Sequence, residues 1–498
     1  MVATDSRSMD GVRRLSSPSR GRRRPASVIR CTALALAIGF AHPLAGRADD
    51  AVSSVAHPPR AAVRNGTVTF DLPAVGAVLI DLDVEGEMGR ALCTGTLIGC
   101  QTVLTAGHCA CLVAPDSCCN SFVHPEDCEL AYDIPADTGA NRIRVFFQNG
   151  GLAEASTIAL GAGDVAMIRL KEPVSGIGPA PLNRESQPVP GVSAMAAGFG
   201  LERYIDGIPQ GAGIKRTALV PLISCEDLPN RFYLCSDASS ADDPGVCEGD
   251  SGGPLFVDLG AGPVVAGVNS FGKFECVPPS GVFSSVLPWL TFVDTAAAGD
   301  LSGAACGDLP AVGAPGVTVH TFDGELTADA GEVRGDFEVP TGTTVLRATM
   351  NGVLITEEGR GNFDLFVEQD GAPSDVGCSD TSDIAVGACE IRSPSPGLWH
   401  VYARRVAGHG EVQLTVTLFG DGTAPSPSPA PSPTPPELCA GDCDGDRSVT
   451  IAELVRSVDI ALGIAPIDDC PSLAVFGETI TIDVLVRTVN AALLGCST

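Results

Sequence analysis

One serine of this 498-residue chain lies in a glycine-rich segment that suits a nucleophile. The segment reads Gly249-Asp250-Ser251-Gly252-Gly253-Pro254. A serine hydroxyl attacks a carbonyl carbon only where a base removes its proton and N–H groups receive the charge that develops on the oxygen. Glycines on both sides of Ser251 allow a tight backbone turn and leave space for a substrate. The segment therefore predicts covalent catalysis by Ser251.

Two other segments supply a base and an acid for such a serine. His108 stands in Thr105-Ala106-Gly107-His108-Cys109, and Asp164 begins the run Asp164-Val165-Ala166-Met167-Ile168-Arg169-Leu170. Histidine accepts a proton near neutral pH, and a carboxylate beside it fixes the imidazole tautomer and stabilises the imidazolium. The order His, Asp, Ser along the chain differs from the orders of subtilisins and α/β-hydrolases. A single histidine is usually structural, but the three segments in this order favour a catalytic triad.

These segments resemble the histidine, aspartate and serine motifs of the trypsin/chymotrypsin family of serine proteases. The resemblance implies that Ser251 attacks the scissile carbonyl, that His108 transfers the proton, and that Asp164 orients the imidazole. It also implies that the N–H groups of Gly249 and Ser251 form the oxyanion hole. Asp250 would then be the buried acid that pairs with the amino terminus released when a zymogen is activated.

The resemblance extends over about residues 63–300 and implies a mainly β, two-barrel protease domain. Short apolar runs broken by Gly and Pro agree with that fold class. The segment Val63-Arg64-Asn65-Gly66-Thr67 is the nearest match to an activated amino terminus, so cleavage would fall after Ala62, or after Arg60 with later trimming. The family pattern implies three disulfides, Cys93–Cys109, Cys225–Cys235 and Cys247–Cys276.

The resemblance also locates the pocket that selects the P1 residue, whose side chain precedes the scissile bond. Gly245 takes the position of the pocket floor, and Gly272 and Gly281 line its walls. Ser270 lies on the strand that binds the substrate backbone. A pocket without a charged floor would leave a buried Lys or Arg unpaired, so we expect an apolar P1 residue. In the alternative, an aspartate of the pair at 242–243 reaches the floor and restores a basic preference.

The chain contains 19 cysteines, which in an exported protein indicate disulfides. Cys100 and the cysteines between residues 109 and 130 form a dense group around His124. An insertion loop held by disulfides is the expected explanation, and a metal-binding clip is the alternative. The sequence does not determine how these cysteines pair.

The first 48 residues have the features of an export signal. Arginines precede a short apolar run at 31–41, and small residues follow at 45–48. The run is too short to span a bilayer, and no other apolar segment has the length of a membrane span. We expect a signal peptide at 1–48, a propeptide at 49–62, and a secreted protein that is extracellular or associated with the cell surface.

Length and charge limit the remaining possibilities. A chain of 498 residues is expected to hold two to four domains. Its formal net charge is −29, and removal of the arginine-rich leader would make it more negative. Such a chain repels nucleic acids and anionic membranes, so neither is expected as a partner.

Residues 316–420 form a second β-rich stretch with alternating polar and apolar residues. The segments Gly361-Asn362-Phe363-Asp364-Leu365-Phe366-Val367 and Pro396-Gly397-Leu398-Trp399-His400-Val401 resemble the bacterial pre-peptidase C-terminal domain. That family is a small β-sandwich appended to secreted peptidases, and here it would bind substrate or a surface, or serve secretion. Cys378 and Cys389 are expected to form a disulfide.

A Ser/Pro-rich linker at 421–437 leads to a third module at 438–498. A twelve-residue loop there has oxygen ligands at the spacing that calcium requires, and it resembles the loops of dockerins and EF-hands. The predicted ligands are Asp442, Asp444, Asp446, the backbone carbonyl of Ser448, Thr450 and Glu453. Apolar residues replace the ligands in a second, similar copy. We therefore expect one Ca²⁺ and a small helical pair that would dock a protein partner.

Two functions remain in competition. A secreted serine endopeptidase would hydrolyse protein or peptide substrates and would need no cofactor for catalysis. In the alternative, the C-terminal modules make the chain a surface or scaffold binding protein, and proteolysis is secondary. The complete triad favours the peptidase.

Overall fold

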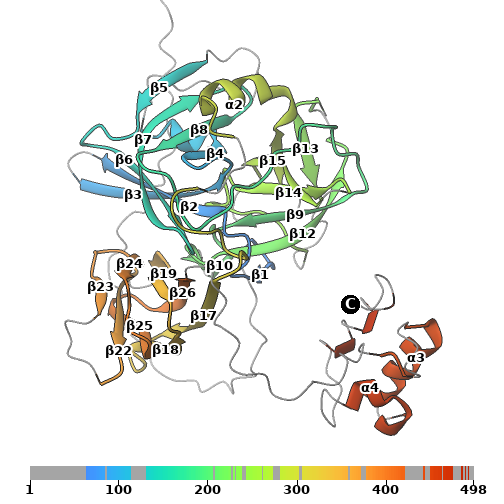
Figure 1. Ribbon diagram of the computed structural model, residues 1–498. Coiled ribbons are helices and arrows are strands. Elements are labelled where there is room, and N and C mark those ends of the chain that lie inside the picture. Colours follow the sequence, from blue (N-terminus) through green and yellow to red (C-terminus); the bar gives the residue numbers. More distant parts are fainter. Residues whose placement is uncertain are drawn as a thin grey trace, which may run out of the picture. The chain divides into compact units, whose positions relative to one another are not determined.

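The computed structural model describes residues 63–84, 87–113, 130–205, 208–225, 228–229, 231–237, 243–260, 262–272, 281–301, 306–356, 359–371, 377–420, 441–443, 449–462, 464–474, 484–485, 488–489 and 492. The fold class is mainly β, as predicted, with two closed six-stranded barrels, further β-sheets and few helices (Figure 1). The predicted signal peptide, propeptide and Ser/Pro-rich linker lie outside the described residues. Within the described ranges, no helix has both the length and the apolar character that a membrane crossing requires.

Six antiparallel strands form the first barrel. They are β2 (Val75–Val84), β3 (Glu87–Leu97), β4 (Thr102–Ala106), β6 (Arg142–Phe147), β7 (Gly151–Leu160) and β8 (Val165–Leu170). Pairing of β7 with β8 closes the order β7-β6-β2-β3-β4-β8, and β5 (Ala131–Pro135) adds to β7. All five residues of β4 are buried, and the short helix α1 (Gly107–Ala110) follows this strand directly. The barrel core therefore fixes the start of α1.

The second barrel repeats this plan with six later strands. They are β9 (Ser193–Gly198), β12 (Arg216–Ile223), β13 (Tyr233–Ser236), β14 (Pro254–Asp258), β15 (Pro263–Phe271) and β16 (Val282–Ser285). Pairing of β9 with β12 closes this barrel, and β1 (Thr67–Val68) adds to β12. A hairpin of β10 (Arg203–Ile205) and β11 (Ile208–Gln210) precedes β12. The chain leaves the barrel through the 3₁₀ turn η4 (Leu287–Trp289) and the helix α2 (Leu290–Ala297).

Residues 317–420 form a sandwich of two four-stranded sheets. One sheet contains β17 (Val317–Leu326), β26 (Gly410–Gly420), β19 (Thr343–Gly352) and β24 (Val386–Arg392). The other contains β18 (Glu332–Val339), β25 (Gly397–Ala407), β22 (Asn362–Gln369) and β23 (Cys378–Asp380). Trp399 is fully buried, and the Cys378–Cys389 disulfide joins β23 of one sheet to β24 of the other. Between the sheets lie apolar residues that alternate with outward polar ones, as in β18.

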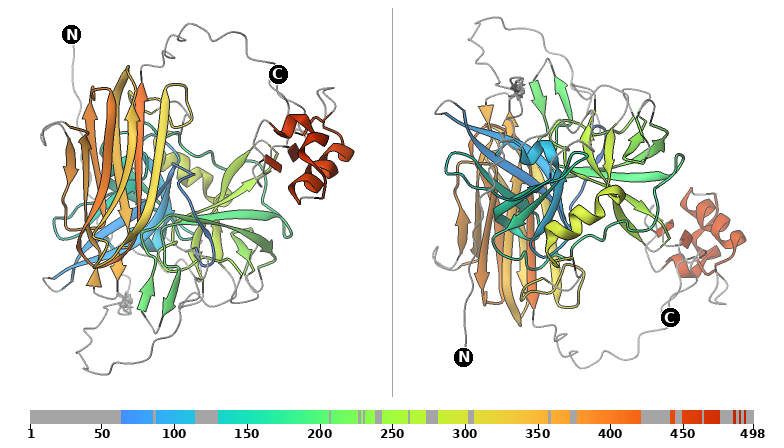
Figure 2. Two further views of the ribbon diagram at one scale, coloured as in Figure 1. Left: turned by 90° about the horizontal axis from the view of Figure 1, so that it is seen from below. Right: turned by 90° about the horizontal axis from the view of Figure 1, so that it is seen from above.

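The sandwich and the barrels form one compact unit that ends at Gly420, and the orange sandwich strands lie beside the first barrel in Figure 2. Five polar side chains of β19 and β26 are no more than 2% exposed: Thr349, Asn351, Gln413, Thr415 and Thr417. Gln413 Oε1 accepts hydrogen bonds from Gln148 Nε2 at 3.0 Å and from Lys215 N at 3.1 Å. The sequence predicts this sandwich as a separate, appended domain because of its resemblance, and alternating polar residues usually face solvent. Here they are buried against the barrels, and four of them bond to the barrels: Thr349, Asn351, Gln413 and Thr417.

The C-terminal residues form a second unit. Its helix α3 (Ile451–Ala461) begins at a capping box made by Thr450 and Glu453. The turn η5 (Ile467–Asp469) and the short helix α4 (Pro471–Ala474) follow. A disulfide joins Cys443 to Cys470. Most of the predicted second calcium-like copy lies outside the described residues.

Candidate active site

His108 and Asp164 meet at one end of the first barrel. His108 lies in α1, directly after β4, and Asp164 directly precedes β8, which pairs with β4. The Nδ1 atom of His108 is 2.9 Å from Asp164 Oδ2 and 3.2 Å from Oδ1. The backbone N–H of His108 also donates to Oδ1, at 2.8 Å. One carboxylate thus binds both the backbone and the ring of the histidine, which leaves Nε2 as the ring nitrogen for proton transfer.

The Asp164 carboxylate is held inside the protein. Asp164 is 1% exposed, whereas 29% of the His108 side chain is exposed. Ser270 in β15 of the second barrel donates its hydroxyl hydrogen to Asp164 Oδ2. Asp164 has a φ of 58°, a sparsely populated conformation that indicates a local constraint. The sequence predicts Ser270 only as a substrate-binding residue, and its contact with Asp164 is a further finding.

Ser251 is half-buried on the loop that leads into β14, and two glycines set the turn of this loop. Gly249 has a φ of 93° and Gly252 a φ of 83°. A Cβ on Gly252 would lie 2.1 Å from Thr105 Oγ1, and a Cβ on Gly249 would lie 2.9 Å from Gly200 Cα. Both positions therefore require glycine. In the part of the chain that the structure describes, the N–H groups of Gly249 and Ser251 have no hydrogen-bond partner.

Thr94, which the sequence did not single out, ties the serine loop to the first barrel. This residue of β3 is fully buried. Its N–H donates to Ser251 O at 2.8 Å, and its hydroxyl donates to Gly249 O at 2.9 Å. The same Oγ1 accepts the N–H of Phe199 at 3.0 Å. A threonine in the middle of a strand has no sequence signature for this role.

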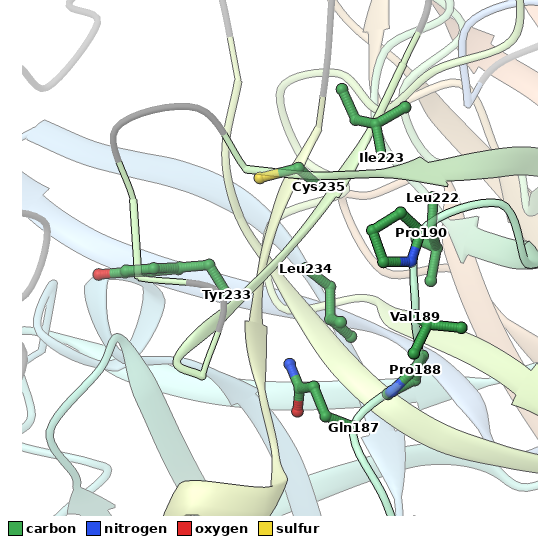
Figure 3. Close-up of a pocket in the computed structure, with 9 residues that line it drawn as sticks. All are labelled: Gln187, Pro188, Val189, Pro190, Leu222, Ile223, Tyr233, Leu234 and Cys235. Carbon is green, nitrogen blue, oxygen red and sulfur yellow. The ribbon is translucent and has the colours of Figure 1, made fainter.

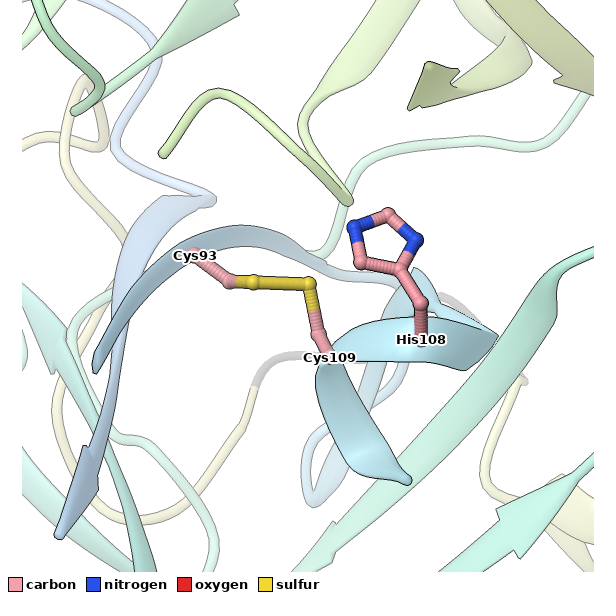
Figure 4. A group of neighbouring side chains, drawn as sticks. All are labelled: Cys93, His108 and Cys109. Carbon is pink, nitrogen blue, oxygen red and sulfur yellow. A yellow bond between two sulfur atoms is a disulfide. The ribbon is translucent and has the colours of Figure 1, made fainter. Parts of the chain in front are cut away.

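The Cys93–Cys109 disulfide lies beside the imidazole of His108 (Figure 4). The Sγ atom of Cys109 is 3.7 Å from Ser251 O, so the serine loop reaches the residue that follows His108. The sulfur atoms and a ring nitrogen of His108 lie within 4.8 Å of one another. Because both sulfur atoms are in the disulfide, they are not available as thiolate ligands of a metal.

The other predicted disulfides are present where their residues are described. Bonds join Cys225 to Cys235 and Cys378 to Cys389. Cys247 is also disulfide-bonded, and its predicted partner Cys276 lies outside the described residues.

The dense cysteine group is described only in part. Cys100 pairs with Cys306, 206 residues later, and Cys111 is disulfide-bonded as well. Neither is therefore a thiolate ligand for the alternative metal clip. His124 and the cysteines at 118–128 lie outside the described residues.

Asp250 is buried below the serine loop. It is 1% exposed, and its carboxylate accepts the N–H of Gly200 and the N–H of Cys247, both at 2.8 Å. Burial raises the pKa of Asp250 to about 7, although these hydrogen bonds and Arg216 act in the opposite direction. A further positive charge beside the carboxylate would favour its ionised form at neutral pH.

The segment that begins at Val63 lies against the loop before the serine. Val63 is fully buried. Arg64 forms a β-bridge with Gly245, whose N–H donates to Arg64 O at 3.0 Å. Asn65 Nδ2 donates to Asp243 O at 3.2 Å. The backbone around the predicted pocket floor is thus paired with the predicted amino-terminal segment.

The apolar side chain of Val246 lies beside Gly281, one of the predicted walls of the P1 pocket, and packs against the core of the second barrel. A Cβ built on Gly281 would lie 2.5 Å from Val246 Cγ2 and 3.2 Å from Ser236 Oγ. Val246 therefore fills the space beside this wall, and the sequence did not single it out. Gly272 follows β15 and is exposed. Asp242 lies outside the described residues.

A separate apolar hollow of about 190 Å³ lies on the second barrel (Figure 3). Gln187, Pro188, Val189 and Pro190 line one side, and residues of β12 and β13 line the other. None of the predicted catalytic or P1-pocket residues contributes to it. Its cysteine, Cys235, is in a disulfide and is therefore not a thiol nucleophile.

The predicted calcium loop is described at its two ends. Asp442 and Glu453 are 4% and 8% exposed. The Glu453 carboxylate accepts the N–H of Cys443, the N–H of Thr450 and the Thr450 hydroxyl, each at 2.8 Å. One of these bonds joins the C-terminal end of the loop to Cys443 at its start. Asp444, Asp446 and Ser448 lie outside the described residues.

Comparison with known proteins places the barrels in a peptidase class. The sequence model of the family described as Trypsin matches residues 76–293. Cercarial protease of Schistosoma mansoni is 29% identical over 222 residues, which cover 41% of this chain and 80% of the relative. Glucanase inhibitor protein 4 of Phytophthora infestans is 28% identical over 211 residues, which cover 40% of this chain and 76% of the relative. Lectizyme of Glossina austeni is 26% identical over 216 residues, which cover 41% of this chain and 74% of the relative.

The two barrels and these similarities define a serine endopeptidase. Residues 76–293 resemble the Trypsin family, and further β-structure follows this part of the chain.

The acid limb of kcat/KM against pH is expected to have its midpoint above pH 6.5. Burial lowers the pKa of His108, but the charge and hydrogen bond of Asp164 outweigh it and raise this pKa above 6.5. A general base must be neutral, so activity falls as the pH drops through the raised pKa. Asp164→Asn should move the limb to lower pH and reduce kcat by roughly 10³–10⁴-fold. An unchanged limb in this variant would contradict the assignment of Asp164.

Proposed function

We propose that the protein is a secreted endopeptidase whose catalytic triad is His108, Asp164 and Ser251. The observation that carries this proposal is the 2.9 Å contact between His108 Nδ1 and the buried Asp164 carboxylate, beside the loop of Ser251. The substrate is a protein or peptide. Disulfides in both barrels support export to an oxidising compartment.

The arrangement supports the following reaction. Ser251 Oγ attacks the scissile carbonyl carbon while His108 Nε2 takes its proton, and Asp164 stabilises the imidazolium. The N–H groups of Gly249 and Ser251 bind the oxyanion of the tetrahedral intermediate. His108 then protonates the leaving amine, and the acyl-enzyme forms. Water, deprotonated by His108, attacks the ester carbonyl and releases Ser251.

We propose that the protease is made as a zymogen and that cleavage after Ala62 activates it. The new ammonium group of Val63 would supply a further positive charge beside the buried Asp250 carboxylate. The full burial of Val63 and the bridge between Arg64 and Gly245 support this position of the mature amino terminus. Trimming after cleavage at Arg60 would produce the same end.

Ser251→Ala should lower kcat for peptide hydrolysis by about 10⁶-fold, because no other hydroxyl takes the place of the nucleophile. The exposed Ser186→Ala is the matched control and should retain full activity. Both purified, activated variants would be assayed with a chromogenic peptide. Full activity of Ser251→Ala would refute the proposed nucleophile.

We propose an apolar P1 preference. Gly245 contributes no charge to the pocket floor, and Val246 contributes apolar surface beside Gly281. A Lys or Arg in such a pocket would be buried without a partner.

Peptides with Phe or Leu at P1 should therefore be cleaved faster than peptides with Arg or Lys. Gly245→Asp should raise kcat/KM for the Arg peptide by about ten-fold or more relative to Gly245→Asn, which has the same shape without the charge. A strong preference of the unmodified enzyme for Arg would instead favour a floor made by the aspartates at 242–243.

We propose that the loop from Asp442 to Glu453 binds one Ca²⁺ and that this unit docks a protein partner. The burial of the acidic residues at its two ends, Asp442 and Glu453, supports the site, because calcium takes carboxylate oxygens as ligands. The alternative role, in which the chain acts chiefly as a surface or scaffold binder, would use this unit and is less favoured.

Calorimetric titration of the full chain with Ca²⁺ should give one site. Asp442→Asn should weaken the affinity by at least about ten-fold because a charged ligand is lost. Asp469→Asn, an exposed acid of η5, is the control and should leave the titration unchanged. Equal affinity for Asp442→Asn and the native chain would refute this site.

A further inference from the structure

Arg216 is a fully buried cation at the start of β12. Its NH1 group donates to Gly211 O at 2.9 Å and to Ile214 O at 3.4 Å. Its NH2 group donates to the carboxylate of Glu411, which belongs to β26 of the sandwich. Glu202 lies 4.0 Å from the same group. A buried guanidinium needs such partners, because an unpaired charge in the interior is costly.

Arg216 also lies next to Asp250. In the pairing of β9 with β12, Arg216 is directly opposite Gly198. A Cβ on Gly198 would be 2.1 Å from Asp250 Oδ1, so the Asp250 carboxylate occupies the space of the missing side chain. Side chains of directly opposed residues lie on the same face of a sheet, with Cβ atoms about 5 Å apart. The Asp250 carboxylate therefore takes the position of the cross-strand neighbour of Arg216.

The charges that act on Arg216 and Asp250 agree with the position of these two side chains next to each other. Burial lowers the pKa of Arg216, and the charges of Glu411, Glu202 and Asp250 act against this effect. Arg203 opposes them as a like charge. Asp250 in turn is stabilised as a carboxylate by Arg216.

The sandwich fixes the segment that carries Arg216. Asn351 Nδ2 donates to Gly213 O at 2.8 Å, and Leu354 N–H donates to Ala212 O at 2.8 Å. The adjacent Lys215 is fully buried, and its N–H donates to Gln413 Oε1. Backbone and side-chain bonds from the sandwich thus hold the chain just before β12.

We propose that the β-sandwich positions the catalytic serine loop through the Glu411–Arg216 pair. Glu411 anchors the guanidinium, and the anchored charge keeps the Asp250 carboxylate on the N–H groups of Gly200 and Cys247. Asp250 precedes Ser251, so its position sets the backbone that binds the oxyanion. The inference rests on the proposed roles of Ser251 and Asp250. Glu411 and Arg216 are positioning residues and do not touch the substrate.

Glu411→Gln tests this coupling in the activated full-length enzyme. Without its anchor, Arg216 becomes free to bond directly to Asp250 and to draw the carboxylate from its two N–H donors. We expect kcat to fall by about ten-fold or more, with KM changed by less than about two-fold, because an oxyanion donor acts on the transition state. Glu411 is 43% exposed, so the variant is expected to fold, and thermal unfolding would be measured beside the kinetics.

Glu390→Gln is the matched control. Glu390 also belongs to the sandwich and also binds a buried arginine, Arg347, which donates to Asn149 O and Ser175 O of the first barrel. That pair is not next to Asp250, so kcat should stay within about two-fold of the native value. In the Arg216→Gln background, Glu411→Gln should have no further effect on kcat, because Glu411 acts through Arg216.

Three outcomes would overturn the inference: an unchanged kcat in Glu411→Gln, an equal loss in Glu390→Gln, or an undiminished effect of Glu411→Gln in the Arg216→Gln background. These results are distinct from failure of the proposed nucleophile. An active native enzyme with an inactive Ser251→Ala variant would support the triad even if Glu411→Gln behaves as the native protein.

Discussion

The buried carboxylate of Asp164 joins the two barrels at the proposed active site. It accepts the backbone and ring N–H groups of His108 from the first barrel and the hydroxyl of Ser270 from the second. A buried charge is tolerated only when hydrogen bonds replace its hydration, so these donors and the carboxylate hold one another in place. Thr94 makes a parallel link, because it joins β3 to the carbonyl of Ser251. The geometry of the proposed triad therefore depends on how the two barrels meet.

The proposed catalytic residues were singled out in the sequence because their signals are local. Each can be recognised from residues a few positions away: the serine from its glycines, the histidine from the following cysteine, and the aspartate from the apolar strand after it. The contacts that support them are not local. Thr94 reaches Gly249 across 155 residues, Ser270 reaches Asp164 across 106, and Cys100 pairs with Cys306 across 206. No spacing rule identifies such partners in one sequence.

The strands of the sandwich could be predicted from the sequence, but its contacts with the barrels could not. Its strands could be predicted from alternation, and so could its disulfide between Cys378 and Cys389. Its docking could not, because Asn351, Gln413 and Thr417 have the polarity of a solvent-facing surface and yet are buried against the barrels. Polar residues that bond to another part of the chain look the same in sequence as residues that bond to water. The sandwich and the barrels therefore belong to one compact unit.

The central claim is that Ser251 is activated by His108 and Asp164. Labelling of the native, activated enzyme with a fluorophosphonate, followed by peptide mapping by mass spectrometry, tests it most directly. The account predicts a single labelled peptide, modified at Ser251, and a labelling rate that falls sharply in Asp164→Asn. Modification at a different serine, or no modification of an enzyme that hydrolyses peptides, would contradict it.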